Sequence, residues 1–186
     1  MQITLLRHGK PEFELTGTAR ACDLNEIARS YDLCGITDKP PSETVMAAKK
    51  HKVVVCSVLP RSLQSANALG FTKIHSATSL FNETSIPHFS QGSVKLPINI
   101  WIVLLRILWL CGFSKNGESI TSAKQRGKLA AQELIKLAER NERVLLVGHG
   151  LINHFIAKEL LDNDWIGPKR SGRNYWEYSI YRYHSN

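Results

Sequence analysis

The segment Ile3-Thr4-Leu5-Leu6-Arg7-His8-Gly9-Lys10 carries the strongest structural signal in the chain. Its apolar half predicts a buried strand, and its polar half places an arginine and a histidine where that strand ends. Such a pair is suited to chemistry on an anion, and the glycine lets the backbone turn tightly. A second pair, His149-Gly150, follows another apolar run, Val144 to Val147. We therefore expect both strands to deliver an imidazole to one edge of the same sheet.

Strand and helix signals alternate along the chain, which predicts an α/β fold. The expected architecture is a three-layer sandwich, in which helices cover both faces of a largely parallel central sheet. Ligands of such sheets bind outside the carboxyl ends of the strands. Arg7-His8, Ser57 to Arg61 and His149-Gly150 all follow expected strands, which indicates one shared site. Strands are expected at residues 2–6, 52–56, 72–75, 143–147 and 175–183, and helices at 18–31, 42–50, 60–69, 119–140 and 149–161.

Composition predicts one globular domain spanning residues 1–186, because 43% of residues are hydrophobic and 22% are charged. The net charge of +8 fits an anionic partner: nucleic acid, an anionic lipid surface or a small phosphorylated substrate. The four cysteines are scattered and form no CxxC pair, which makes a disulfide framework improbable and favours a reducing, cytoplasmic setting. The N-terminus also lacks the residue order of a signal peptide.

The segment 97–113 is expected to form an apolar helical insert. It is shorter than the roughly 20 apolar residues of a membrane-spanning helix, and Arg106 stands at its centre. We expect a helix that is buried or covered by a partner. A dimer contact or attachment to a membrane surface is the alternative.

Phosphoryl transfer to an imidazole has requirements that this chain can meet. The attacking histidine must be neutral, since a protonated ring has no free lone pair. Fixed cations must neutralise the phosphate, and the planar fork of arginine suits this task. The leaving alkoxide needs a proton from a carboxylic acid. The residues themselves point to Arg7, His8 and His149 for the first two roles and do not single out one acid.

An ordered set of motifs runs from residue 2 to about residue 160, and it resembles the histidine phosphatase superfamily, also called the phosphoglycerate mutase-like fold. Each motif lies in that family's order and at a plausible spacing. The motifs are Leu5-Leu6-Arg7-His8-Gly9, Ser57-Val58-Leu59-Pro60-Arg61, Leu80-Phe81-Asn82-Glu83, Gly117-Glu118-Ser119 with Arg126, and Val147-Gly148-His149-Gly150.

This resemblance implies a role for each matching residue. His8 would be the phosphorylated nucleophile and Glu83 the proton donor, with Glu12, Glu14, Glu43 and Glu118 as rival acids. The phosphate pocket would contain Arg7, His8, Arg61, His149, Gly150 and Ser57. The implied enzyme is a phosphoric monoester hydrolase of the histidine acid phosphatase type, with no cofactor and no metal, acting on a small phosphorylated substrate or a phosphoprotein.

Departures from the family pattern leave the substrate open, because Lys10-Pro11-Glu12 and Thr84 to His88 replace the usual residues. A phosphoglycerate mutase-type phosphotransferase and a non-catalytic phospho-ligand or protein-binding module stay as alternatives. Lys169, Arg170 and Arg173 form a basic cluster without a nucleic-acid-binding motif, so we expect a solvated face and no nucleic acid partner. His88 is a candidate for the rim of the pocket. The histidines expected to serve only packing or the surface are His51, His75, His154 and His184.

Overall fold

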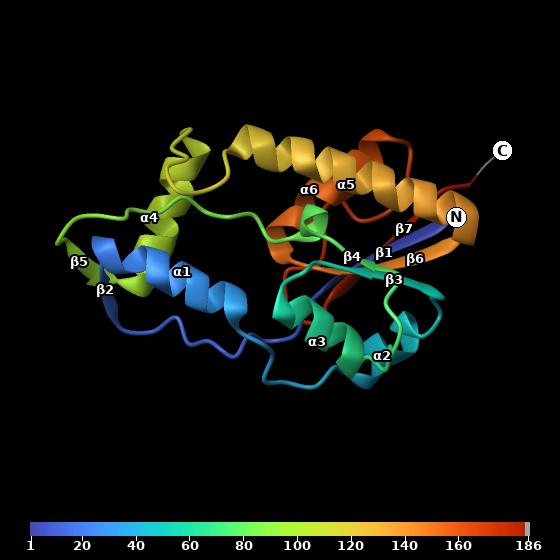
Figure 1. Ribbon diagram of the computed structural model, residues 1–186. Coiled ribbons are helices and arrows are strands. Elements are labelled where there is room, and N and C mark those ends of the chain that lie inside the picture. Colours follow the sequence, from blue (N-terminus) through green and yellow to red (C-terminus); the bar gives the residue numbers. More distant parts are fainter. Residues whose placement is uncertain (185–186) are drawn as a thin grey trace.

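Five strands form the central sheet, in the spatial order β4-β3-β6-β1-β7 (Figure 1). The computed structural model describes residues 1–184. Neighbouring strands from β4 to β1 run parallel, and β7 pairs antiparallel with β1 at the edge. The prediction of a largely parallel sheet is confirmed. The strands are β1 (Gln2–Arg7), β3 (Val53–Cys56), β4 (Ser76–Ala77), β6 (Arg143–Gly148) and β7 (Tyr178–Arg182).

Helices cover both faces of this sheet, as the sequence predicts. In Figure 1, α5 and α6 lie over one face and α2 and α3 over the other. The strand β6 is apolar from Val144 to Val147 because Val144 and Leu146 pack in the core under α5 and α6, whereas Leu145 and Val147 pack towards α2 and α3. The helices are α1 (Leu24–Leu33), α2 (Ser42–Ala48), α3 (Pro60–Ala68), α4 (Ile98–Leu110), α5 (Ile120–Asn141) and α6 (Gly150–Asp162).

The parallel strands β1, β3 and β6 end at the same edge of the sheet. Leu6 of β1 and Cys56 of β3 both pair with Val147 of β6. The residues that follow these three positions therefore emerge side by side. This register places Arg7-His8, Ser57 and Gly148-His149 together, which confirms the shared edge expected from the sequence.

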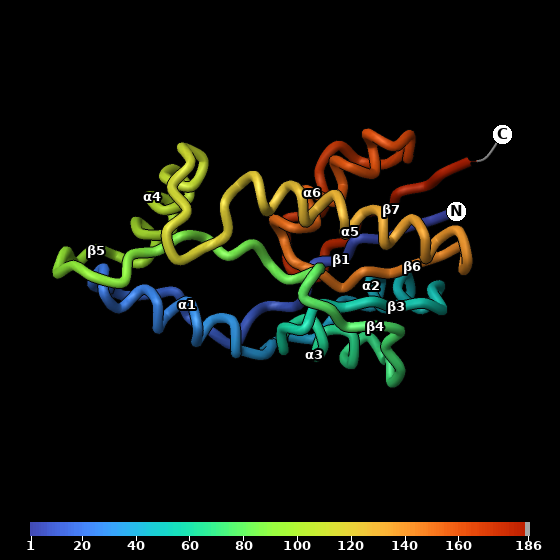
Figure 2. The backbone as a smooth tube through the Cα atoms, turned by 45° about the horizontal axis from the view of Figure 1, so that its top comes forward, coloured from blue at the N-terminus to red at the C-terminus, as the bar shows by residue number. Residues whose placement is uncertain are grey.

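A second, two-stranded sheet pairs β2 (Thr18–Arg20) with β5 (Lys95–Pro97) in antiparallel fashion. Together with α1 and α4 it forms what we call the α4 lobe, which extends away from the central sheet (Figure 2). The helix expected over residues 18–31 is wrong at its start, because the pairing with β5 holds Thr18–Arg20 extended. A short 3-10 helix, Ala21–Asp23, then leads into α1.

Two strand predictions need correction. The short strand expected at residues 72–75 lies at Ser76–Ala77, where the backbone pairs with Val55 and Cys56. The last strand begins at Tyr178, so residues 175–177 belong to the preceding loop. Here Trp176 has a φ of 63°, a left-handed conformation that no strand residue adopts.

The apolar insert expected at residues 97–113 forms α4, and only one of its faces is buried. No helix in the part of the chain that the structure describes is long and apolar enough to cross a membrane. Partner or membrane-surface contact by the outer face stays a prediction. The buried side chains are Ile98, Trp101, Leu105 and Trp109. The outer face exposes Ile100, Val103, Ile107 and Leu110.

Candidate active site

His8 lies directly after β1 and is held in one tautomer. Its Nδ1 is 2.6 Å from the carbonyl oxygen of Gly9. A carbonyl only accepts, so Nδ1 carries the proton and Nε2 keeps its lone pair. Burial lowers the pKa of His8 to about 3; the bond to Gly9 opposes this effect and the charges of Arg61 and Arg7 add to it. The ring is therefore neutral near pH 7, as a nucleophile requires.

Gly9 forms the turn that follows His8 and helps to orient its side chain. A Cβ at this position would collide with the ring of Trp176, so the turn accepts only glycine. Its N–H donates to Ser65 Oγ at 2.9 Å, and that hydroxyl donates to the carbonyl of Arg61 at 2.6 Å. The loop after β1 and the first turns of α3 are therefore fastened to each other.

His149 precedes the first residue of α6 and faces His8, with ring centroids 4.9 Å apart. Its Nε2 lies 2.6 Å from Ser57 Oγ, which also accepts the N–H of Leu59 at 3.2 Å. The Ser57 hydroxyl can then donate to Nε2, which places the ring proton on Nδ1. Burial, followed by the charges of His8 and Arg61, lowers the pKa of His149 well below its usual value.

The two arginines of the predicted pocket come from different elements, Arg7 from the end of β1 and Arg61 from the first turn of α3. Arg61 is fully buried: its Nη1 donates to the carbonyl of Tyr31 at 2.9 Å and its Nη2 lies 3.3 Å from Asp32 Oδ1. The guanidinium of Arg7 donates to the carbonyl of Arg173 and lies 4.4 Å from the centroid of the Tyr175 ring. In both arginines the Nε–H stays without a partner.

Three of the six buried polar side-chain atoms that lack a hydrogen-bond partner among residues 1–184 belong to this pocket. They are Arg7 Nε, Arg61 Nε and His149 Nδ1. Buried donors in native proteins are nearly always satisfied, so each unpaired group needs an explanation. Three N–H donors near one neutral imidazole fit an anion with several oxygens.

Glu83 is the acid that the structure brings to this pocket. Its Oε1 accepts the N–H groups of Thr84, Leu151 and Ile152 at 3.0 to 3.2 Å, whereas Oε2 has only a contact with Leu151 at 3.3 Å. The carboxylate thus caps the N-terminus of α6, where the helix dipole favours it. A Cβ placed on Gly150 would lie 3.6 Å from Arg7 Cζ and 3.8 Å from Glu83 Oε2, so these groups meet there.

Arg126 fixes the chain that leads into Glu83. Its guanidinium forms a bidentate pair with Glu118, at 2.9 and 2.7 Å. Its Nη1 also donates to the carbonyls of Leu80 and Asn82, at 3.0 and 2.7 Å. The motif residues Glu118 and Arg126 therefore hold the backbone that leads into Glu83.

A cavity of about 490 Å³ opens beside these groups, with Arg7, Glu83 and Gly150 in its lining. His8, Ser57, Arg61 and His149 do not line it and are buried. The predicted site residues thus lie in one contiguous cluster, in which Arg7, Glu83 and Gly150 reach the cavity and the others lie buried behind its wall. A more open depression of about 620 Å³, between Thr78 and Gln125, contains none of the predicted site residues.

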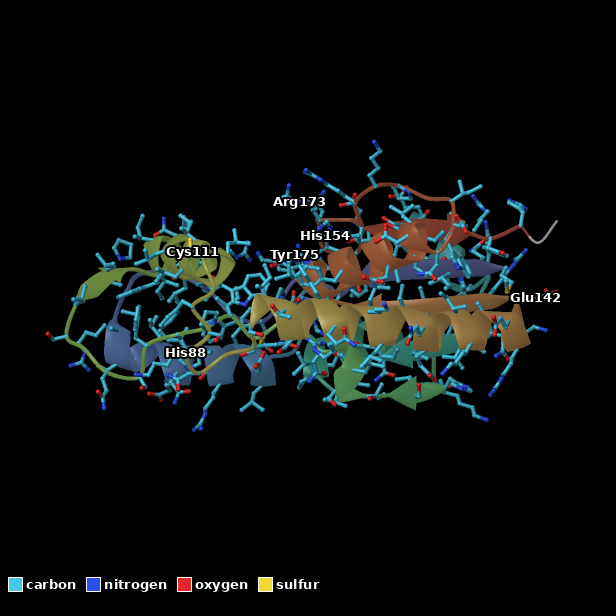
Figure 3. The ribbon with its side chains drawn as sticks, turned by 90° about the horizontal axis from the view of Figure 1, so that it is seen from above. His88, Cys111, Glu142, His154, Arg173 and Tyr175 are labelled. Atoms are coloured by element: carbon cyan, nitrogen blue, oxygen red, sulfur yellow. The ribbon has the colours of Figure 1, made fainter. Side chains whose placement is uncertain are left out.

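Sequence reasoning missed part of this cavity. Tyr175 lies over Arg7, and Arg170 and Arg173 line the cavity, although they were expected on a solvated face. His154 lines it too, and burial and then the charge of Arg170 lower its pKa; that it serves only packing or the surface stays a prediction. Figure 3 shows Arg173, His154 and Tyr175 together where the α4 lobe meets the sheet.

His51 and His88 lie outside the cavity lining. His51 is buried in packing contacts, with its Nε2 2.9 Å from Thr4 Oγ1. His88, the candidate for the pocket rim, lies 3.2 Å from Asn25 Oδ1 and is not part of the cavity lining.

Solved structures with the same fold include several phosphatases. An open reading frame product from Mycobacterium tuberculosis is 17% identical, with a TM-score of 0.63 over 96% of this chain and 89% of its own. A mycobacterial glucosyl-3-phosphoglycerate phosphatase is 19% identical, with a TM-score of 0.62 over 96% and 91%. Phosphoserine phosphatase from Entamoeba histolytica is 22% identical, with a TM-score of 0.55 over 87% and 80%. At these identities the likeness shows the fold.

The sequence comparisons differ in outcome. No curated protein sequence matches this chain. The family model described as histidine phosphatase superfamily (branch 1) matches residues 3–186, which is nearly the whole chain and includes every motif of the site. The chain belongs to the histidine phosphatase superfamily.

Proposed function

We propose that this protein is a metal-independent phosphomonoester hydrolase that acts through a phosphohistidine on His8. One observation carries the proposal: the unpartnered N–H donors of Arg7, Arg61 and His149 surround a histidine that is neutral and has its Nε2 free. The three N–H donors would bind the oxygens of a phosphoryl group, and the lone pair on His8 Nε2 would attack its phosphorus. Guanidinium groups supply the positive charge that neutralises the phosphate.

In the first half of the reaction, His8 Nε2 attacks phosphorus as the ester P–O bond breaks. The leaving alkoxide takes a proton from Glu83, for which Oε2 is the available oxygen because Oε1 is held by three backbone N–H groups. The phosphorylated ring is cationic, and the carbonyl of Gly9, 2.6 Å from Nδ1, stabilises that charge. The alcohol then leaves.

In the second half, a water molecule attacks the phosphohistidine while the Glu83 carboxylate accepts its proton. The P–N bond breaks, inorganic phosphate forms, and His8 returns to the neutral tautomer. The same carboxyl group serves as acid and then as base, as microscopic reversibility requires. Membership of the superfamily and the phosphatases among the structural neighbours support this chemistry, while the substrate itself is left open.

Trapping the intermediate tests the proposal. The protein is mixed with p-nitrophenyl phosphate, quenched within the first turnover in alkaline detergent, and digested for mass spectrometry. We expect one added phosphoryl group on the peptide that contains His8, stable in alkali and lost in acid. His8→Ala should show neither the label nor turnover, and the matched control His75→Ala, at an exposed position, should show both. A label on another residue, or a burst without any label, contradicts the proposal.

Product analysis separates the alternatives. A phosphorylated isomer of the substrate in place of free phosphate would assign the protein to the mutases. Tight binding of inorganic phosphate with no turnover on a broad panel of esters would assign it to phospho-ligand binding modules.

A further inference from the structure

The cavity next to the proposed phosphate pocket is lined by more arginines than are required to neutralise one phosphate group. Its charged lining consists of half-buried Arg7 and Glu83 together with Arg106, Arg170 and Arg173, which are exposed towards solvent. We call the last three the outer arginines. They come from two distant segments: Arg106 from α4, and the other two from the loop before β7.

The outer arginines have no acidic partner among residues 1–184. The ion pairs there join Arg20 with Asp23, Arg61 with Asp32, and Arg126 with Glu118. Glu83 is the one carboxylate in the cavity lining, and its Oε1 is bound to the N-terminus of α6. In the proposed reaction Arg7 and Arg61 balance the phosphoryl dianion. The outer arginines are then surplus, and three like charges around one cavity create a positive potential that attracts anions.

Hydrogen bonds fix the backbone that carries two of these arginines. Glu177 Oε2 accepts the N–H groups of Arg173 and Asn174, both at 2.8 Å. Ser179 Oγ accepts the N–H of Gly172 at 3.0 Å, and the carbonyl of Arg173 accepts a hydrogen bond from Arg7. The loop is thus tied both to β7 and to the arginine of the phosphate pocket. The fold therefore sets the backbone position of Arg173 relative to the phosphate pocket.

We propose that the outer arginines select small phosphate monoesters that carry a second anionic group, a carboxylate or a further phosphate, beside the ester cleaved at His8. This inference rests on the proposed function and specifies its substrate class. The cavity volume of about 490 Å³ fits a small molecule. Leu110 and Trp109 line the same cavity and would pack against the carbon skeleton between the two anionic groups.

Matched substrate pairs test the selection. Phosphate release is measured for n-alkyl phosphates, for ω-carboxyalkyl phosphates of the same chain lengths, and for the corresponding alkane bisphosphates. We expect a higher kcat/KM for the members with a second anion at one preferred length, and the carboxylate and bisphosphate series identify which group is preferred. The preference should fall as salt is added, because the outer arginines are exposed.

Variants then assign the preference to residues. Arg106→Ala, Arg170→Ala and Arg173→Ala should each lower the ratio of kcat/KM between the ester with a second anionic group and the plain ester by roughly threefold to tenfold. The Arg173 carbonyl that accepts from Arg7 survives this substitution. Arg140→Ala, which removes an exposed arginine at the end of α5 outside the cavity lining, is the matched control and should leave the ratio unchanged.

The outcomes separate this inference from the proposed function. If plain esters are hydrolysed through His8 at the same efficiency as the matched esters that carry a second anionic group, the function stands and the selection is wrong. Selection for acidic phosphopeptides, with no discrimination among small esters, would also overturn it. If no ester is hydrolysed and no phosphohistidine forms, both proposals fall together.

Discussion

The rings of His8 and His149 lie next to each other at the edge of the sheet, with their centroids 4.9 Å apart and their planes inclined by 59°. The parallel register of β1 and β6 brings the two rings together. Arg7 pairs with Gly148 at the ends of the two strands, and a histidine directly follows each of these residues. Burial lowers the pKa of both rings, so the approach brings no repulsion between cations. The two rings can therefore divide the work, one as nucleophile and the other as a donor to phosphate.

The division of work predicts different losses for the two histidines. His149→Ala removes one hydrogen-bond donor from the phosphoryl oxygens and keeps the nucleophile, so kcat should fall by about a hundredfold to a thousandfold. His8→Ala should abolish turnover. Steady-state kinetics with p-nitrophenyl phosphate measures both effects. Equal and complete loss in the two variants would show that His149 is needed for more than binding the oxygens.

Substitution of Glu83 should affect substrates according to their leaving groups. Glu83→Gln keeps an oxygen acceptor for the N–H groups of Leu151 and Ile152 and removes the transferable proton. We expect kcat to fall at least tenfold more on alkyl phosphates than on aryl phosphates, whose leaving groups need little protonation. Parallel rate measurements on the two classes decide this. The same loss on both classes would assign the proton transfer to another group.

The sequence predicted the part of the site that the strands deliver. Arg7, His8 and His149 follow apolar runs, and parallel strands must end at a common edge, so their meeting could be inferred before the structure was known. The position of Glu83 could not be inferred in this way. It lies on an irregular segment after a 3-10 helix, and its place depends on the N-terminus of α6 and on the hydrogen bonds of Arg126. The resemblance to the superfamily selected it, whereas periodicity alone could not.

The cavity wall could not be predicted for a similar reason. Arg170, Arg173 and Tyr175 belong to a loop whose sequence has no hydrophobic periodicity. Hydrogen bonds hold this loop in place, one from Arg7, which is distant in sequence, and one to Glu177. The two-stranded sheet of the α4 lobe could not be predicted for the same reason. Thr18–Arg20 forms a strand only because residues 95–97 pair with it, which no local pattern reveals. Long-range contacts override local propensity in both places.

The low pKa of His8 predicts a pH dependence of stability. Below about pH 6.5 the unfolded chain binds a proton at this residue, and the folded protein does not until about pH 3. Acid therefore favours the unfolded state. Between pH 7 and pH 5 the free energy of unfolding should fall by about 2 kcal/mol more in the wild type than in His8→Asn. Urea unfolding at both pH values measures this difference, and His75→Asn should behave as the wild type.

Access to the nucleophile is the last property that the geometry predicts. His8 is 1% exposed, and Tyr175 lies over it with a ring-centroid distance of 5.8 Å while also stacking on Arg7. Tyr175 itself is 38% exposed and lies in a loop, so it is the side chain best placed to admit a substrate. Tyr175→Ala should increase the rate at which diethyl pyrocarbonate modifies His8. Mass spectrometry of the peptide that contains His8 measures this rate. Inorganic phosphate should protect His8 from modification. Tyr175→Phe keeps the ring and should react at the wild-type rate. If removal of the ring leaves the modification rate unchanged, another side chain must cover His8.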